Sequence, residues 1–379
     1  MMLYRKLGQT GERVSILGFG CMRLPVFNEK PEMIDQEKAA QLLHYAIDSG
    51  INYIDTAYPY HKGRSESFLG DALKDGYREM VYIATKLPSW DIKSREDMDI
   101  YLEEQLRKLN TDHIDFYLVH SLNSDYWKNL TELGLFDFLD SAIDDGRIKY
   151  AGFSFHDDNE TFREIVDAYS WSLCQIQYNI VDEYYQAGKD GLFYAADKGL
   201  GIVIMEPMRG GCLAEMVPGD IRKVWDSCDV QRSPAQWCLE YLWDYKEVDV
   251  VLSGMSNIKQ LEMNLKAAEN GYSGLLTTEE RNIISKVGDM YRTKLAVDCG
   301  GCRYCLPCPV GVNIPLNFKY LNNASIFNNI EMTRKNYINH LGNERKASKC
   351  TGCGQCESRC PQHIPIIKTL QKVVDVLEK

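Results

Sequence analysis

The sequence lacks an excess of positive charge, a long apolar run and an N-terminal secretory pattern. Its 379 residues carry 43 Lys and Arg against 54 Asp and Glu, a formal net charge of −11 at pH 7, and no basic run offsets this balance. Nucleic acids and anionic membranes are bound through basic patches, so we expect neither as a partner. Because no stretch of about 18 apolar residues occurs and the N-terminus carries no signal pattern, we expect a cytoplasmic protein without a membrane span.

The composition is that of a folded protein with an uneven distribution of cysteine. Hydrophobic residues make up 45% of the chain and charged residues 26%, so the chain can bury a full core, and its length predicts more than one domain. Eight of the 13 cysteines lie in the last 81 residues. A secreted disulfide scaffold would be short and would carry a signal, so metal binding is the better interpretation of these eight. The other five are expected to pack as small apolar groups. They are Cys21, Cys174, Cys212, Cys228 and Cys238.

Three consecutive predicted strands are followed at once by a residue that can hold or move a proton. The strands are residues 51–54, 81–85 and 114–119. The residues that follow them are Asp55, Lys86 and His120, and Tyr60 lies five residues beyond the first of these. A carboxylate at a strand end can also bond the amides of the next loop or pair with a neighbouring cation. Three such ends in succession favour a chemical site.

The four side chains suit proton transfer to a carbonyl oxygen. A phenol with an ordinary pKa near 10 is a weak acid at neutral pH, but a neighbouring ammonium stabilises the phenolate and lowers that pKa. Asp55 would hold Lys86, and Lys86 would tune Tyr60. His120 could donate a hydrogen bond to the substrate oxygen. The implied reaction delivers hydride to a carbonyl carbon and a proton to its oxygen.

The first 270 residues alternate short apolar runs with amphipathic stretches, which predicts a (β/α)8 TIM barrel. Besides the three strands above, the strand candidates are residues 14–19, 150–153, 173–176, 201–205 and 248–252. The helix candidates are residues 37–49, 66–74, 95–108, 137–145, 159–169, 191–198, 233–243 and 258–269. A last helical stretch, residues 278–292, falls outside the eightfold pattern and is expected to lead out of the barrel.

Two motifs resemble those of the aldo/keto reductases over residues 1–296. Residues 4–22 read YRKLGQTGERVSILGFGCM and are similar to that family's N-terminal signature. The stretch Asp55-Thr-Ala-x-x-Tyr60-x-x-Gly63-x-Ser65-Glu66 is similar to its catalytic loop. The resemblance implies that Asp55, Tyr60, Lys86 and His120 form the catalytic tetrad of a reductase barrel.

The resemblance also implies which residues bind a nicotinamide cofactor, although two positions depart from the family pattern. It implies that Ser154 and Gln175 bond the nicotinamide carboxamide and that Met205 lies on its ring. The family commonly has Asn after that Ser, where this chain has Phe155, and an aromatic residue at the position of Met205. Both Ser154 and Gln175 could equally be polar caps of strand ends.

The segment after the last predicted strand resembles the family's site for the dinucleotide phosphates and adenine. The implied residues are Ser253, Gly254, Ser256, Gln260 and Asn264. Gln260 stands where Arg or Lys is frequent, so a 2′-phosphate would lose its usual charged partner. Lys259 could replace it or be a solvated helix residue. The cofactor is therefore NADP or NAD.

Two cysteine arrays follow the barrel and predict a ferredoxin-like domain over residues 297–379. They are Cys299-x2-Cys302-x2-Cys305-x2-Cys308-Pro309 and Cys350-x2-Cys353-x2-Cys356-x3-Cys360-Pro361. The spacing resembles bacterial two-cluster ferredoxins, in which three thiolates of each array hold one [4Fe-4S] cluster and the fourth ligates the other. That implies one cluster on Cys299, Cys302, Cys305 and Cys360. It implies a second cluster on Cys350, Cys353, Cys356 and Cys308. The first array has two residues rather than three before its last Cys, and two zinc sites are the alternative interpretation.

The two halves differ in the number of electrons that they move. Nicotinamide transfers two electrons as hydride and each cluster transfers one, so exchange between them needs a mediator such as FMN, which no motif indicates. The favoured hypothesis is a reductase that transfers hydride between NAD(P)H and a small-molecule carbonyl or alcohol substrate, with clusters that are structural or regulatory. The second hypothesis is a flavin-mediated oxidoreductase coupled to an external ferredoxin, motivated by Met205 and Phe155. The third is a non-enzymatic redox sensor on a reductase barrel, against which the intact tetrad argues.

A few residues near these motifs allow two interpretations. His61, beside Tyr60, could line the substrate mouth, but we expect it to be solvated, and His156 is similarly ambiguous. Tyr58, Trp90 and Trp127 could form an apolar substrate wall or pack locally.

Overall fold

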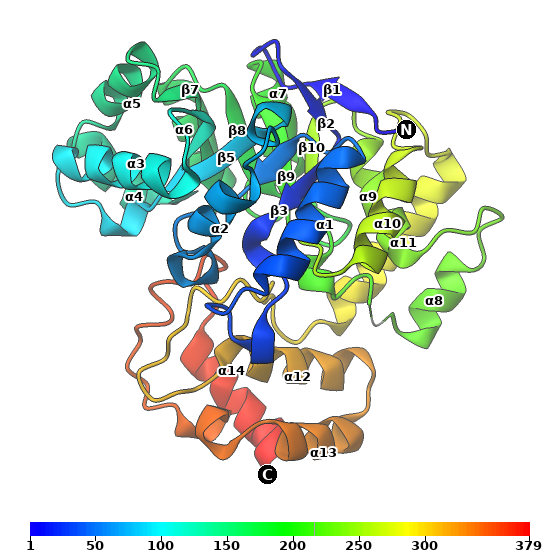
Figure 1. Ribbon diagram of the computed structural model, residues 1–379. Coiled ribbons are helices and arrows are strands. Elements are labelled where there is room, and N and C mark those ends of the chain that lie inside the picture. Colours follow the sequence, from blue (N-terminus) through cyan, green and yellow to red (C-terminus); the bar gives the residue numbers. More distant parts are fainter. Residues whose placement is uncertain (216) are drawn as a thin grey trace. The chain divides into compact units, whose positions relative to one another are not determined.

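The structure is a computed structural model that describes residues 1–215 and 217–379. The chain divides into two compact units, drawn in Figure 1. The first comprises Met1–Pro207 and Gln236–Thr277, and the second comprises Met208–Ala235 and Thr278–Lys379. The predicted division of the sequence at residues 296 and 297 stays a prediction.

The first unit contains a closed barrel of parallel strands, which confirms the predicted TIM barrel. In spatial order the strands run β10-β3-β4-β5-β6-β7-β8-β9 and then return to β10. Their bounds are β3 (Leu17–Gly20), β4 (Tyr53–Asp55), β5 (Tyr82–Leu87), β6 (Ile114–Leu122), β7 (Ile148–Phe155), β8 (Leu173–Gln177), β9 (Gly201–Met205) and β10 (Val250–Ser253). Because all the strands are parallel, their C-terminal ends meet at one end of the barrel.

Helices follow the barrel strands and lie around them in Figure 1. They are α1 (Gln36–Asp48), α2 (Ser65–Ala72), α3 (Arg95–Leu109), α4 (Ser124–Glu132), α5 (Leu135–Asp144), α6 (Asn159–Ala168), α7 (Gly188–Asp197), α9 (Pro234–Trp243) and α10 (Ile258–Ala268). In α1, Asp35 caps the first turn by accepting a hydrogen bond from the Lys38 amide, and the buried residues Leu42, Leu43 and Ile47 lie on one face. This pattern of cap and apolar stripe is what makes a surface helix.

A hairpin closes the N-terminal end of the barrel. Its strands are β1 (Tyr4–Lys6) and β2 (Arg13–Ser15), which pair antiparallel. Leu7 and Val14 of this hairpin belong to the same buried cluster as barrel residues such as Phe116. The side chains of that cluster fill the barrel interior, so the C-terminal ends of the strands are the end open to chemistry.

The second unit is mainly α-helical. It contains α8 (Gly219–Trp225), α11 (Thr278–Lys294), α12 (Ile314–Ile326), α13 (Ile330–His340) and α14 (Ile366–Val373). Val312, Phe318, Tyr337 and Leu370 are among its core residues, and cysteines of both arrays pack against them. In the described part of the chain, none of the helices is both long and apolar enough to cross a membrane.

Candidate active site and cluster site

Asp55 and Lys86 form a buried ion pair at the C-terminal end of the barrel. Asp55 is the last residue of β4, and Lys86 lies near the end of β5, where the predicted strand stopped one residue earlier. The Lys86 ammonium donates to Asp55 Oδ2 and to the Thr56 carbonyl, both at 2.7 Å. Lys86 is fully buried, so its charge depends on these acceptors.

Tyr60 and His120 lie beside this pair. Tyr60 begins a short 3-10 turn (Tyr60–Gly63), and Lys86 Nζ is 5.1 Å from the centre of its ring. His120 lies within β6, and its ring is 6.3 Å from that of Tyr60 and nearly perpendicular to it. The structure thus brings together all four residues of the predicted tetrad.

Burial sets the charge states at this site. It raises the pKa of Asp55 above its ordinary value, and the Lys86 ammonium opposes that shift. Burial also lowers the pKa of the His120 imidazole well below 6.5, and the charges of Lys86 and His156 act in the same direction. His120 is therefore neutral at pH 7, with one ring N–H that can donate a hydrogen bond.

A second layer of hydrogen bonds supports Lys86. Glu66 of α2 accepts from Thr85 Oγ1 at 2.7 Å and from Gln105 Nε2 at 2.6 Å, and the same amide nitrogen lies 3.1 Å from the Lys86 carbonyl. The two helices approach closely here, because a Cβ on Gly70 of α2 would meet the backbone of α3 at 2.3 Å. This packing holds the end of β5, which carries Lys86, in a fixed position.

The residues implied for the nicotinamide lie on the neighbouring strands β7, β8 and β9. Ser154 pairs in register with Gln175, and its Oγ accepts from the Ser121 amide at 2.7 Å. Gln175 Nε2 is 3.7 Å from Met205 Sδ, whereas its Oε1 is buried without a hydrogen-bond partner among the described residues. A buried amide oxygen without a partner is costly, and the N–H of a carboxamide would satisfy it. These residues therefore fit a nicotinamide.

The loop after β10 is organised around the start of α10. Ser253 Oγ accepts from Asn264 at 3.0 Å, and Gln260 Oε1 accepts from the Ser256 amide at 2.9 Å. Gly254 lies against Arg23, whose side-chain carbons would be 3.2 Å from a Cβ at that position. The five residues implied for the phosphate and adenine site lie at the end of β10, in the loop after it or in the first turns of α10, where backbone N–H groups suit an anion.

Four cysteines from both arrays line one cavity in the second unit. They are Cys299, Cys302, Cys305 and Cys360. Burial raises the pKa of the Cys305 thiol, and negative charge on the other three would raise it further. Burial also raises the pKa of the Cys356 thiol, and negative charge on Cys350 and Cys353 would raise it further. All eight thiols are free of disulfides.

The cavity fits the cluster implied by the cysteine spacing. The four cysteines line the same space, as the ligands of one four-iron cube must, and they combine three from one array with one from the other. Among the described residues, no three His, Cys, Asp or Glu side chains lie close enough to ligate a single metal ion.

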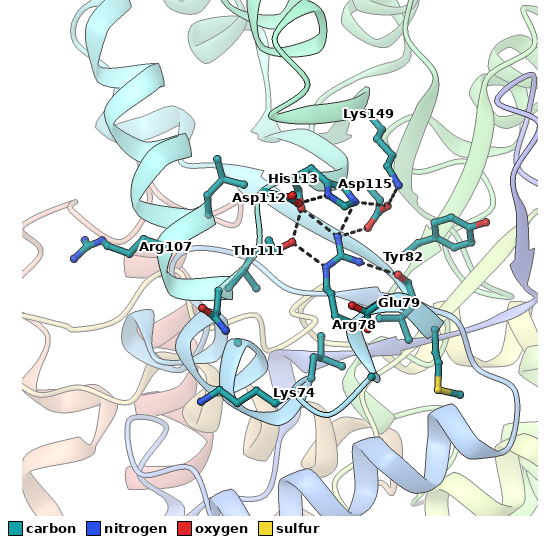
Figure 2. Close-up of a pocket in the computed structure, with 18 of the residues that line it drawn as sticks. Lys74, Arg78, Glu79, Tyr82, Arg107, Thr111, Asp112, His113, Asp115 and Lys149 are labelled. Carbon is teal, nitrogen blue, oxygen red and sulfur yellow. Dashed lines mark hydrogen bonds and ion pairs between the residues drawn. The ribbon is translucent and has the colours of Figure 1, made fainter.

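A wide pocket lies at the opposite end of the barrel. Its volume is about 1200 Å³, and it adjoins the N-terminal ends of β5, β6 and β7. Figure 2 shows Arg78 and Lys149 turned toward Asp115, and both form ion pairs of 2.9 Å with it. Because these charges are satisfied by one another and chemistry in such barrels sits at the other end, we interpret this network as structural.

Three residues near the tetrad differ from expectation or were not predicted. His61 is buried, with both ring nitrogens in contact with residues 21–31, where we expected a solvated side chain. Ser121 follows His120 at an irregularity of β6 and has a positive φ of 54°, with a buried Oγ that lacks a partner among the described residues. Gln105 carries no signal in the sequence, because any polar residue suits a helix.

Of the three aromatic residues considered for a substrate wall, Trp90 lies at the tetrad. Its ring is 5.1 Å from that of His120. Tyr58 donates to Glu104 at 3.3 Å, and Trp127 donates to Glu164 at 2.9 Å, so both have local partners. His156 is buried, with Nδ1 3.3 Å from Gln186 Oε1.

Comparison with known proteins shows the family of the chain. Residues 16–287 match the aldo/keto reductase family, and residues 298–364 match a 4Fe-4S dicluster domain. The chain is 28% identical over 309 residues to an uncharacterized oxidoreductase, YqkF, of Bacillus subtilis (strain 168), covering 74% of this chain and 94% of that protein. It is 26% identical over 296 residues to a probable aldo-keto reductase of Glycine max, covering 69% and 83%. A solved aldo-keto reductase from Bacillus halodurans is 28% identical, with a TM-score of 0.64, covering 76% of this chain and 96% of that chain. This chain therefore belongs to the aldo/keto reductase family of oxidoreductases and carries a C-terminal 4Fe-4S dicluster domain.

Proposed function

We propose that the chain transfers hydride between NADH or NADPH and an aldehyde or ketone, with Tyr60 as the general acid. The observation that carries this proposal is the position of the Lys86 ammonium, 2.7 Å from Asp55 and 5.1 Å from the Tyr60 ring, with His120 beside them. Membership in the aldo/keto reductase family supports the same reaction class.

Each residue has a defined task in this proposal. Asp55 keeps Lys86 charged, and the ammonium stabilises the phenolate that forms when Tyr60 gives its proton to the carbonyl oxygen. The field of Lys86 is strong because its ammonium is fully buried. Neutral His120 donates its ring N–H to the same oxygen and so orients the carbonyl.

The cofactor residues follow from the same arrangement. When bound, the nicotinamide supplies the hydride. Ser154 and Gln175 would bond its carboxamide and Met205 would lie on its ring, and the Gln175 Oε1 acceptor without a partner among the described residues supports this assignment. Ser253, Gly254, Ser256, Gln260 and Asn264 would hold the phosphates and adenine. The uncharged Gln260 is why we retain both NADH and NADPH.

The tail would hold two [4Fe-4S] clusters. Cys299, Cys302, Cys305 and Cys360 would ligate one, supported by the cavity that they line. Cys350, Cys353, Cys356 and Cys308 would ligate the other, supported by the resemblance of the spacing to two-cluster ferredoxins and by the match to a dicluster domain.

The Tyr60→Phe variant tests the proposed reaction. It removes the proton donor and keeps the ring, so we expect carbonyl reduction to fall by about 10²-fold or more while nicotinamide binding persists. The measurement is steady-state reduction of a panel of aldehydes and ketones, together with a titration of NADH and NADPH by fluorescence.

Tyr58→Phe is the matched control, because the Tyr58 hydroxyl bonds Glu104 and lies outside the tetrad. We expect this variant to keep its activity. Unchanged turnover in Tyr60→Phe would contradict the proposed role of Tyr60.

A further inference from the structure

His61 joins the turn that carries Tyr60 to the segment that follows the first barrel strand. We call residues 21–34, between β3 and α1, the first loop. The His61 Nδ1 atom is 2.7 Å from the Pro31 carbonyl. Its Nε2 atom accepts from the Leu24 amide at 3.3 Å and lies 3.1 Å from the Cys21 carbonyl. One buried ring thus contacts both ends of the 3-10 turn Cys21–Arg23 and a point near the end of the first loop.

Both nitrogens of the ring contact backbone groups of the first loop. Nδ1 contacts the Pro31 carbonyl, and Nε2 contacts both the Leu24 amide and the Cys21 carbonyl. An apolar residue at position 61 would leave the Leu24 amide and the Pro31 carbonyl without these bonds.

The backbone of the turn that carries Tyr60 is left-handed at two successive residues. His61 and Lys62 both have a φ of 52°, and two successive residues other than glycine in this region are uncommon. Lys62 also reaches the first loop, through an ion pair of 3.2 Å with Glu32 that is largely exposed. A left-handed backbone held by contacts to a second segment is typical of a functional site.

The first loop also borders the predicted cofactor site. Arg23 packs its side-chain carbons on Gly254, in the loop after β10. Cys21 is buried within the electrostatic reach of Asp55 and Lys86. Within the loop, Val26 and Ile34 pair through an antiparallel bridge. The first loop therefore lies between the turn of Tyr60 and the loop of Gly254.

We propose that His61 is a positioning residue that fastens the first loop to the turn of Tyr60. Through this fastening, the proton donor keeps a fixed place relative to the loop that contains Gly254. The catalytic consequence rests on the proposed function, whereas the fastening itself does not.

The proposal is tested by substitutions of His61 that keep one, or neither, of its contacts with the Pro31 carbonyl and the Leu24 amide. His61→Ala removes both bonds. His61→Asn keeps a donor near Nδ1 and tolerates a positive φ, and His61→Gln keeps an acceptor near Nε2. Lys62→Ala is the matched control, because it removes only the exposed ion pair with Glu32.

The first readout is backbone amide hydrogen exchange in the ligand-free protein. In His61→Ala we expect exchange over residues 21–34 to accelerate by about tenfold or more, and the Leu24 amide to lose its protection. His61→Asn should restore protection near Pro31, and Lys62→Ala should exchange like the wild type. Unchanged exchange in His61→Ala would overturn the fastening. If that variant does not fold, hydrogen exchange over residues 21–34 is compared between His61→Asn and His61→Gln. Because each of these variants keeps a different bond, equal exchange in both, at the rate of the wild type, would overturn the fastening.

The second readout is the split between kcat and KM. We expect His61→Ala to lower kcat for carbonyl reduction by about tenfold with little change in the KM for the carbonyl, and His61→Asn to recover part of the loss. Accelerated exchange with an unchanged kcat would overturn the positioning role. If the wild type reduces no carbonyl compound, the proposed function fails, and hydrogen exchange still decides whether His61 fastens the first loop.

Discussion

The burial of His120 as a neutral imidazole should cost stability at acidic pH. Its pKa in the folded chain is well below 6.5, whereas in the unfolded chain it takes up a proton near its ordinary pKa of about 6.5. Between the two values the unfolded chain binds more protons, so the free energy of unfolding falls as pH drops below about 6.5. At pH 5.5 we expect His120 to account for about 1 kcal/mol of this loss.

The check is chemical denaturation of the wild type and of His120→Asn at pH 7.5 and at pH 5.5. Asn does not titrate, so the difference in unfolding free energy between the two proteins should shrink by about 1 kcal/mol at the lower pH. A difference that is the same at both pH values would mean that His120 titrates in the folded chain as it does in the unfolded one.

That Asp55, Lys86 and His120 lie together could be predicted from the sequence, because each follows an apolar run that is recognisable as a strand. Parallel strands carry their C-terminal residues to one end of a barrel whatever the details of packing. Ser121 and Gln105 could not be predicted in this way. Ser121 depends on an irregularity in β6, and Gln105 depends on how closely α3 packs against α2 at Gly70. The burial of His61 depends on a loop from another part of the sequence.

At the scale of elements, Asp115 joins the starts of β5, β6 and β7. It accepts from Arg78 at 2.9 Å, from the Ile83 amide at 3.0 Å and from Lys149 at 2.9 Å. Burial by itself would raise the pKa of Asp115, but Arg78, Lys149 and the Ile83 amide outweigh it and lower the pKa below its ordinary value. Asp115→Asn leaves two cations with a weaker acceptor, so we expect a loss of about 3 kcal/mol in unfolding free energy.

Asp112→Asn is the control for this prediction. Asp112 borders the same pocket but is exposed, and it pairs only with His113 among the described residues. We expect a change below about 1 kcal/mol in urea denaturation. The kcat of both variants should stay near that of the wild type, because the network is at the end of the barrel opposite the tetrad. Equal losses in the two variants would show that burial of the Asp115 pair does not stabilise the strand starts.

Helices and strands differed in how far the sequence could predict them. Strand β1 and the second-unit helices α8, α12, α13 and α14 were not anticipated. The eight barrel strands and most helices of the first unit were anticipated, since apolar runs and stripes are local patterns. Helix α4 was not, because its segment is largely polar and buries only Trp127 and Leu130. Its start depends on Asn123, which accepts a hydrogen bond from the Tyr126 amide, and such a cap is hard to recognise without an apolar stripe behind it.

At the scale of the whole molecule, the second unit could be predicted from the spacing of its cysteines and not from its helices. That spacing indicates a cluster domain, and it implies that the arrays exchange a ligand. Which thiols share a cavity is decided by tertiary packing. The core of the second unit places Cys360 beside the first array, some 50 residues earlier in the chain.

Cys360→Ser tests this crossed ligation. The wild-type protein, purified without oxygen, should contain about eight irons per chain if both clusters are present. Loss of Cys360 should destabilise the cluster on Cys299, Cys302 and Cys305, so we expect about four irons to remain and the circular dichroism of the barrel to persist. The measurement is iron, sulfide and zinc analysis together with the visible spectrum.

Cys228→Ser provides the matched control, because this cysteine lies outside both arrays and is buried in the same unit. It should retain all the iron. Cys302→Ser should give the same partial loss as Cys360→Ser, since both thiols line one cavity. If Cys360→Ser instead kept its full iron, or if the wild type contained zinc in place of iron, the crossed assignment would be wrong. The double variant Cys302→Ser/Cys360→Ser distinguishes crossed ligation from one cluster per array. About four irons should remain if both thiols ligate the same cluster, whereas loss of nearly all the iron would show that each array holds a cluster of its own.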